Sequence, residues 1–219
     1  MSEALLREEV IRFCRLLHAK GWLAAADGNL SVRLAPDRVL VTPSAVPKAF
    51  LTPEDLVVVD GQGRLLEGSR PPTTELPMHL EALRVRPDVR AVVHAHPPTC
   101  IALSLVKDAV LDGVLPEVIL DVGRLAIVPY ARPGTVELAD AISRELAARD
   151  AVILERHGSL SVGATLLDAY ALTERLEHAA QVLWMAHAIG RPTRLSAAEA
   201  DALESLHARN RDARTARVG

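Results

Sequence analysis

The stretch Val92-Val93-His94-Ala95-His96 decides how the rest of this chain is interpreted. It closes an apolar run that begins at Val89, and a short run rich in valine predicts a buried strand. Because side chains alternate across a strand, His94 and His96 point to the same face. Their stems stand about 6–7 Å apart at a rise of roughly 3.3 Å per residue. Two imidazoles at this separation can converge on one divalent ion.

Two further residues can join this pair at the ends of predicted elements. The apolar run 151–154 ends just before His157, and Glu75 lies at the start of a predicted helix. Three histidines and a carboxylate are the ligand set of a catalytic zinc site that leaves room for substrate. On spacing alone the alternative stays open, because a chain with 8 histidines can contain one His-x-His by chance. His79, one helical turn after Glu75, is either an orienting partner or a satisfied buried histidine.

Length and composition restrict the class of protein. The chain has 219 residues, of which 49% are hydrophobic, 24% charged and 3% aromatic. These values fit one globular domain whose core is built from aliphatic side chains. The formal net charge of −3 offers no electrostatic support for binding nucleic acid or an anionic membrane.

Cysteine usage and the lack of a targeting signal indicate the compartment. Cys14 and Cys100 lie far apart in apolar helical stretches, and no Cys-x-x-Cys occurs, which is typical of a reducing compartment. The N-terminus has no basic segment followed by a long apolar stretch. No apolar run reaches the ~18 residues of a membrane span. We therefore expect a cytoplasmic protein without a membrane partner.

Hydrophobic periodicity predicts helices that alternate with short strands. Helices are expected at about 6–17, 75–85, 99–106, 135–148, 165–189 and from 196. Strands are expected at about 29–32, 39–41, 56–59, 64–66, 89–96, within 119–128, at 151–154 and at 159–162. Short strands this close together favour an antiparallel sheet. The prediction is one α/β domain over 1–219, with a central, mainly antiparallel sheet flanked by helices, a core of about 5–190 and a helical tail of about 191–219.

Three separate loops supply small polar side chains suited to an anion. They are Asn29 with Ser31, Thr42 with Ser44, and Thr73 with Thr74. The third pair precedes a predicted helix, where unpaired N–H groups and the helix dipole favour negative charge. Each loop also has a plain structural explanation, as an N-cap or a turn former. No P-loop or Gly-x-Gly-x-x-Gly fingerprint occurs, so nothing indicates a nucleotide.

Six short motifs follow one another along the chain. They are Asp27-Gly28-Asn29-Leu30-Ser31, Val41-Thr42-Pro43-Ser44, Pro72-Thr73-Thr74-Glu75, Val93-His94-Ala95-His96, Pro129-Tyr130 and Arg156-His157-Gly158-Ser159. In this order and spacing the set resembles the class II aldolase/adducin family, and within it the L-fuculose-1-phosphate aldolase branch. The resemblance covers about residues 5–190, so it includes most of the chain.

The resemblance implies a zinc ion held by His94, His96 and His157, with Glu75 as a further ligand and the catalytic acid/base. Manganese or cobalt in place of zinc stays open. It also implies a pocket for the phosphate of a small sugar substrate, built from Asn29, Ser44, Thr73, Thr74 and the backbone at Ala45. The family fold is a central antiparallel sheet between helices, assembled as a homotetramer with active sites between neighbouring subunits.

Two features depart from the family pattern. Position 45 is usually glycine in the family, and Ala45 would be strained at a positive φ. Fuculose phosphate aldolases use a tyrosine after the His-x-His strand and another in the C-terminal tail as proton donors, whereas this chain has only Tyr130 and Tyr170. Our hypothesis is that Glu117 takes the proton-donor role, in its own or a neighbouring subunit's site. A solvated loop carboxylate is the equal alternative.

The implied activity is that of a zinc-dependent aldolase. A ketose 1-phosphate similar to L-fuculose 1-phosphate would be cleaved to dihydroxyacetone phosphate and an aldehyde through a metal-stabilised enediolate. This route needs no Schiff-base lysine, and neither Lys48 nor Lys107 lies in a predicted site.

Three alternatives stay open. A zinc-dependent decarboxylase of a 3-oxo-tetronate 4-phosphate-like sugar acid fits the altered proton-donor region. A pentulose-phosphate 4-epimerase would need an extra acid/base pair for which this chain shows no counterpart. A non-catalytic scaffold, as in the adducin branch, would lack the ligand set that is present here.

Overall fold

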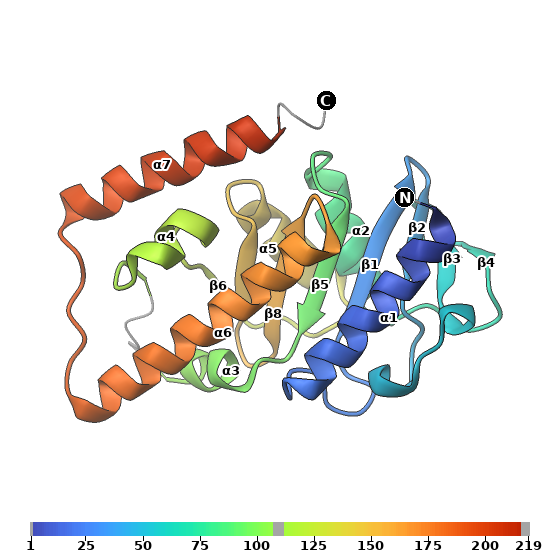
Figure 1. Ribbon diagram of the computed structural model, residues 1–219, viewed down its shortest axis with the longest axis horizontal. Helices are drawn as coiled ribbons and strands as arrows, with labels where there is room; N and C mark the ends of the chain where they lie inside the picture. The colour runs from blue at the N-terminus through green and yellow to red at the C-terminus, as the bar shows by residue number, and fades with distance from the viewer. Residues whose placement is uncertain (1, 107–111, 216–219) are drawn as a thin grey trace.

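A central sheet of eight strands organises the computed structural model, which describes residues 2–106 and 112–215 (Figure 1). The strand order is β4-β3-β2-β1-β5-β8-β7-β6. Every neighbouring pair is antiparallel except β6 and β7, which run parallel. The strands are β1 (Asn29–Ala35), β2 (Arg38–Val41), β3 (Val57–Val59), β4 (Leu65–Glu67), β5 (Ala91–Ala95), β6 (Ile127–Val128), β7 (Ala151–Leu154) and β8 (Gly158–Gly163). This confirms the predicted α/β domain with a mainly antiparallel sheet.

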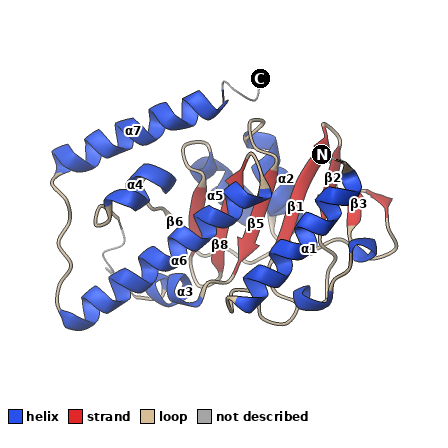
Figure 2. Ribbon diagram, viewed as in Figure 1, coloured by secondary structure: helices blue, strands red, loops and turns tan. Residues whose placement is uncertain are grey.

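Helices cover both faces of this sheet (Figures 1 and 2). On one face lie α1 (Glu3–Ala19) and α6 (Leu166–Ile189), and on the other lie α2 (Leu76–Val85) and α5 (Val136–Leu146). The remaining described helices are α3 (Pro98–Ser104), α4 (Pro116–Val122), α7 (Ala197–Thr215) and the short 3-10 helices η1 (Lys48–Phe50) and η2 (Pro53–Asp55).

Alternating side chains of β5 contribute to two separate cores. Ala91 and Val93 pack with residues of α1 and α6, whereas Val92 packs with residues of α2 and α5. This period of two places His94 on the α2 side of the sheet. His94 is fully buried there, so the strand that the sequence predicts also positions one of the predicted metal ligands.

The start and the end of α6 follow from local sequence signals. Thr165 and Asp168 form a capping box, in which the Thr165 hydroxyl accepts from the Asp168 N–H (3.1 Å). The Asp168 carboxylate in turn accepts from the Thr165 N–H (2.9 Å). The helix ends at Ile189, just before Gly190. The predicted span of about 165–189 is confirmed.

The segment 119–128 corrects the sequence prediction. A strand is expected within it, but residues 119–122 form the second half of α4, and only Ile127–Val128 is strand. Pro116 in the first turn of α4 and Gly123 after its end, at φ 85°, are boundary signals for a helix. A short apolar run by itself does not distinguish a helix from a strand, so packing against α6 and α7 decides this segment.

A buried carboxylate on α6 fixes the chain just after His96. Glu177 is 1% exposed and accepts hydrogen bonds from the N–H groups of Thr99 and Cys100 at 3.0–3.2 Å. It also accepts from the Thr99 hydroxyl at 2.6 Å. These contacts satisfy N–H groups at the start of α3 that the helix itself leaves free. They hold α3 against α6 directly after the predicted metal-binding strand.

The cysteines and the helix lengths bear on the class of protein. Cys14 and Cys100 are free and buried, in agreement with the apolar helical stretches in which the sequence places them. None of the described helices is both long and apolar enough to cross a membrane.

Candidate metal centre

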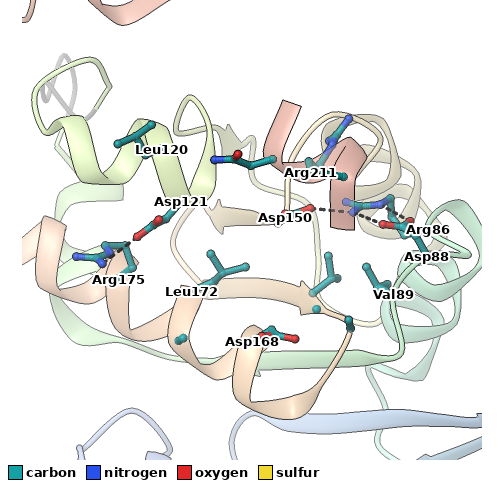
Figure 3. A pocket seen from close by; sticks show the side chains of 16 residues that line it. Arg86, Asp88, Val89, Leu120, Asp121, Asp150, Asp168, Leu172, Arg175 and Arg211 are labelled. Atoms are coloured by element: carbon teal, nitrogen blue, oxygen red, sulfur yellow. Dashed lines mark hydrogen bonds and ion pairs between the residues drawn. The ribbon is translucent and has the colours of Figure 1, made fainter. Parts of the chain in front are cut away.

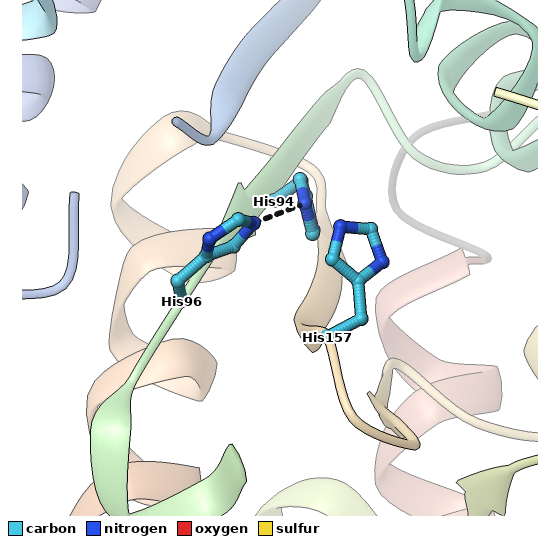
Figure 4. A group of neighbouring side chains, drawn as sticks. All are labelled: His94, His96 and His157. Carbon is cyan, nitrogen blue, oxygen red and sulfur yellow. Dashed lines mark hydrogen bonds between the residues drawn. The ribbon is translucent and has the colours of Figure 1, made fainter. Parts of the chain in front are cut away.

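Two strand pairings and one hairpin bring the three predicted histidines together (Figure 4). β5 lies between β1 and β8, so that His94 pairs with Asn29 on one side and Leu160 on the other. The turn between β7 and β8 then places His157 beside the end of β5. The ring centroids of His94, His96 and His157 lie 4.7–5.0 Å apart.

The close approach of this turn to β5 requires glycine at position 158. A Cβ there would collide with the carbonyl oxygen of Ala95 and lie 2.9 Å from Cδ2 of His96. Arg156, just before His157, adopts the left-handed backbone region at φ 63°. Strain of this kind in a non-glycine residue persists where the surrounding structure enforces it. Here it belongs to the tight turn that carries His157.

The candidate ligand atoms lie close together, because one nitrogen of each histidine is within 4.8 Å of a nitrogen of the other two. Nitrogen and oxygen ligands at about 2.0–2.2 Å from Zn²⁺ lie roughly 3.3–3.5 Å from one another. His94 Nε2 lies 3.0 Å from His96 Nε2 and 3.3 Å from Glu75 Oε2. His157 Nε2 lies 3.1 Å from Glu75 Oε1. The three histidines therefore form a group that could hold one ion, and Glu75 borders this group through its two carboxylate oxygens.

A hydrogen bond from Nδ1 leaves the Nε2 atom of His94 unprotonated, and this Nε2 faces the other candidate ligands. His94 Nδ1 lies 2.8 Å from the carbonyl oxygen of Ser159, which can only accept, so Nδ1 carries the proton. In the neutral imidazole Nε2 then keeps its lone pair. His157 Nδ1 is buried without a hydrogen-bond partner among the described residues, while Glu75 Oε1 has His157 Nε2 at 3.1 Å. A cation at the centre of the cluster would satisfy the carboxylate oxygen.

The protonation of the cluster also suits a cation. Burial, followed by repulsion from His94 and His157, lowers the pKa of His96 to about 3, so this imidazole is neutral near pH 7. Burial would raise the pKa of Glu75, but His94 and hydrogen bonds from His157 and Asn29 outweigh burial and lower it. The site thus presents an ionised carboxylate beside a neutral imidazole.

A buried chain of hydrogen bonds holds Glu75 from behind. The Asn29 amide donates to Glu75 Oε2 (2.8 Å) and to Thr73 Oγ1 (3.0 Å), so its Oδ1 faces His79 Nε2 at 2.5 Å. Because this oxygen only accepts, His79 Nε2 carries the proton, and His79 Nδ1 accepts from Ser31 Oγ at 2.7 Å. His79 is therefore a satisfied buried histidine that also orients the carboxylate through Asn29.

His79 is expected to make the metal-free protein sensitive to acid. Burial first, and then the neighbouring His94, lowers the pKa of His79 from 6.5 to about 3. The unfolded chain binds a proton near pH 6.5 that the folded chain does not bind until about pH 3, so stability is lost as the pH falls through this window. The free energy of unfolding should fall by about 1.4 kcal/mol per pH unit from this group. Urea unfolding below pH 6.5 measures the slope, and His79→Gln should flatten it. Equal slopes in the two proteins would contradict the assignment.

The histidines border a cavity of about 230 Å³. Its wall contains every residue predicted for the phosphate pocket, namely Asn29, Ser44, Ala45, Thr73 and Thr74. Glu75, His96 and His157 line the same cavity, while His94 is fully buried. The structure therefore brings together all the predicted site residues except Glu117.

Comparison with known proteins connects this arrangement to a family. A sequence model described as Class II Aldolase and Adducin N-terminal domain matches residues 8–184. The chain belongs to this family. It is 38% identical over 175 residues to the L-fuculose phosphate aldolase of Methanococcus vannielii, which covers 80% of this chain and 93% of that protein. It is 33% identical over 188 residues to the 3-oxo-tetronate 4-phosphate decarboxylase of Haemophilus influenzae, which covers 84% of this chain and 89% of that protein.

Solved structures of the class II aldolase family share the fold. The L-fuculose-1-phosphate aldolase from Thermus thermophilus aligns with a TM-score of 0.74 and 32% identity, over 86% of this chain and 96% of that one. The resemblance that the six sequence motifs indicate is confirmed. The family contains both aldolases and decarboxylases among the relatives, so membership alone does not choose the reaction.

This class II aldolase family member carries alanine in the loop where glycine is usual, and Ala45 indeed has φ 58°. The left-handed region costs a non-glycine residue roughly 1–2 kcal/mol. Ala45→Gly is expected to stabilise the fold by about 0.5–1 kcal/mol, because the greater freedom of glycine in the unfolded chain offsets part of the relief. Urea unfolding measures this change. Ala49→Gly, in the neighbouring helix η1, is the control and should destabilise. If Ala45→Gly lowers the free energy of unfolding instead, the backbone at Ala45 is not strained.

Glu117 lies outside the cavity. It is exposed in the first turn of α4 rather than in a loop, which corrects the sequence prediction. None of the described residues that line the cavity belongs to α4. A proton-donor role for Glu117 is thus restricted to a neighbouring subunit's site.

Lys48 is a residue of the cavity that no sequence pattern singled out. It is 1% exposed and lines the wall beside Ser44, contrary to the prediction that it lies in no site. Its position in the same loop, four residues after Ser44, was the available signal. Lys107 lies outside the described residues.

A second cavity, of about 570 Å³, is larger but contains none of the predicted site residues (Figure 3). Val89, which precedes β5, lines it, so this cavity lies at the opposite end of that strand from His96. Its most buried cation, Arg86, already pairs with Asp88 (2.7 Å) and Asp150 (2.8 Å). Arg86, Asp88 and Asp150 therefore neutralise one another and link the end of α2 to the start of β7. The predicted site residues that line a cavity therefore all border the smaller one.

Proposed function

We propose that this protein is a zinc-dependent lyase that cleaves the C3–C4 bond of a ketose 1-phosphate and yields dihydroxyacetone phosphate and an aldehyde. The observation that carries the proposal is that three histidines able to hold a metal ion, with Glu75 beside them, border a cavity lined by hydroxyl and amide groups. Such groups can bind a phosphate through hydrogen bonds. The 38% identity to an L-fuculose phosphate aldolase supports the same substrate class.

The donor set fits zinc. His94, His96 and His157 would hold the ion, with Glu75 at the fourth position, and three imidazoles with one carboxylate suit Zn²⁺. When bound, such an ion supplies a Lewis acid that polarises a carbonyl and stabilises negative charge on its oxygen. Metal analysis of the purified protein decides between zinc and the manganese or cobalt alternatives.

Glu75 is placed to move a proton at the cavity wall. The hydrogen bond from Asn29 keeps its carboxylate in one orientation, and the same carboxylate lines the cavity. In the proposed reaction Glu75 accepts a proton from the bound three-carbon fragment and returns it. The Ser31–His79–Asn29 chain orients Glu75 without contacting the substrate itself.

The test is exchange of the C3 protons of dihydroxyacetone phosphate with D₂O, followed by NMR in the presence of zinc-loaded protein. We expect stereospecific loss of one proton, abolished by a chelator and restored by zinc. A folded, zinc-loaded protein that catalyses no exchange would overturn the aldolase proposal.

Decarboxylation of a 3-oxo-tetronate 4-phosphate-like acid is the second candidate, supported by 33% identity to such a decarboxylase. No tyrosine occurs among the described residues that line the cavity. Tyr170 packs against Phe13 and Trp22 in the core, and Tyr130 is exposed. Loss of carbon dioxide leaves no aldehyde, so it needs no tyrosine to take the proton from the C4 hydroxyl, as aldol cleavage does. Carbon dioxide release from such an acid, without proton exchange into dihydroxyacetone phosphate, would place this reaction first. No observation favours the epimerase.

We also propose that the chain works in the cytoplasm as a homotetramer with active sites between subunits. The C-terminal half of α6 exposes Trp184, Met185 and Ile189, which are large apolar side chains that a subunit contact would cover. Light scattering measures the assembly. In such an assembly a neighbouring subunit brings Glu117 to the cavity, and Glu117→Gln should then slow turnover. Unchanged turnover would remove Glu117 from the mechanism.

A further inference from the structure

A buried ammonium group stands in the wall of the proposed substrate cavity. Lys48 is 1% exposed, and it is the one lysine or arginine among the described residues that line this cavity. Its Nζ donates to the carbonyl oxygens of Ala26 (2.7 Å) and Val46 (3.1 Å). An ammonium group has three N–H donors, so two are used here, and neither acceptor neutralises the charge.

Lys48 has no counter-ion within the described residues. No carboxylate among the side chains that the structure describes comes within the 4.0 Å of an ion pair with its Nζ. Asp27 and Glu75 line the same cavity and act on Lys48 only at longer range. Taking a charge out of water is costly unless it is paired, and burial accordingly lowers the pKa of Lys48. An unpaired buried cation at a cavity wall indicates that a ligand supplies the missing anion.

We propose that Lys48 is the electrostatic partner of the substrate's phosphate group and selects phosphorylated over unphosphorylated ligands. This inference rests on the proposed function, because it takes the neutral side chains around Ser44 and Thr73 as the place where the phosphate binds. The same wall carries the carboxylates of Asp27 and Glu75, which repel a dianion. A cation in this wall offsets that repulsion.

A nucleophilic role for Lys48 does not fit its surroundings. A Schiff base requires an uncharged amine whose lone pair can reach a carbonyl carbon. Nζ is instead held by two carbonyl acceptors and has almost no exposed surface. The same two hydrogen bonds connect the segments around Ala26 and Val46. The experiment must therefore separate an electrostatic role from that of a structural brace.

Calorimetry with two ligands separates them. Zinc-loaded wild-type and Lys48→Met proteins are each titrated with inorganic phosphate and with unphosphorylated dihydroxyacetone. Methionine keeps an unbranched chain but removes the charge. We expect the Kd for phosphate to rise about 10–100-fold, the range for a hydrogen bond to a charged group, while the Kd for dihydroxyacetone is unchanged. Lys20→Met is the matched control, because it removes an exposed lysine that pairs with Glu174.

Each outcome decides the role of Lys48. An unchanged Kd for phosphate overturns the proposal. Equal weakening of both ligands also overturns it, because Lys48 would then act as a brace. A third outcome separates this inference from the proposed function. If Lys48→Met weakens only phosphate binding and the wild-type protein catalyses no C3 proton exchange, Lys48 remains an anion-recognition residue and only the proposed reaction is overturned.

Lysine NMR tests the proposal without altering Lys48. The chain has three lysines, so protein labelled with [¹⁵N]lysine has few side-chain signals to assign, with the help of Lys20→Met and Lys107→Met. We expect inorganic phosphate to shift the Lys48 ammonium signal and to leave that of Lys20 in place. An unmoved Lys48 signal at saturating phosphate overturns the proposal even where Lys48→Met fails to fold.

Discussion

Glu75→Gln is expected to slow C3 proton exchange of dihydroxyacetone phosphate by about 10²–10⁴-fold, the range that a positioned acid/base group contributes. Glutamine has nearly the same shape and can still accept the hydrogen bond from Asn29 through its amide oxygen. It cannot accept the substrate proton at neutral pH. NMR in D₂O with zinc-loaded variant and wild-type protein measures the two rates.

The interpretation of this variant depends on its zinc content, since Glu75 is also a proposed ligand. Metal analysis of the same samples separates loss of the base from loss of the ion. Glu81→Gln is the matched control, because Glu81 lies on the same helix and pairs with Arg84 at the surface. It should exchange at the wild-type rate. A zinc-loaded Glu75→Gln protein that also did so would show that another group moves the proton.

His157→Ala is expected to weaken zinc binding by more than about 10²-fold, because loss of a direct ligand exceeds the 10–100-fold that loss of a supporting partner costs. His157 lies in the turn before β8 and is partly exposed, so its removal leaves the strand pairing intact. The stabilisation that zinc confers on the folded state should fall with the affinity. Competition with a chromophoric chelator measures the Kd, and thermal unfolding with and without zinc measures the stabilisation.

The control for this variant is His178→Ala, which removes an exposed histidine of α6. Its zinc affinity should equal that of the wild type. Wild-type affinity in the His157→Ala protein would exclude His157 from the ligand set and leave His94, His96 and Glu75 as the candidate ligands.

Local signals in the sequence were sufficient for most elements of the fold. The capping box at Thr165 and the stop at Gly190 bounded α6, and the apolar run before His94 located β5. The same approach was wrong for residues 119–122, where an apolar stretch allowed either a strand or a helix. Helix and strand preferences of so short a run are weaker than its packing against neighbouring helices.

The candidate site was predicted in part because its parts are local. Strand alternation predicted that His94 and His96 share a face, the ends of predicted elements added His157 and Glu75 as candidates, and the family resemblance implied the same set. None of these arguments predicted a role for Lys48. Its proposed role depends on its burial beside Ser44 without a counter-ion, and burial is a property of the folded chain. Glu117 lies away from the cavity of its own chain because α4 does not border it, so its proton-donor role stays a prediction for a neighbouring subunit's site.

The sequence by itself determined the mainly antiparallel α/β architecture, the family and the set of groups available for metal and phosphate binding, because these depend on periodicity, on capping signals and on short motifs. Only the tertiary structure decided that Asn29, paired with His94 across β1 and β5, connects His79 to Glu75. It also decided which cation faces the cavity. Both results arise from contacts between residues far apart in the chain, and such contacts form only when the strands pair and the helices pack.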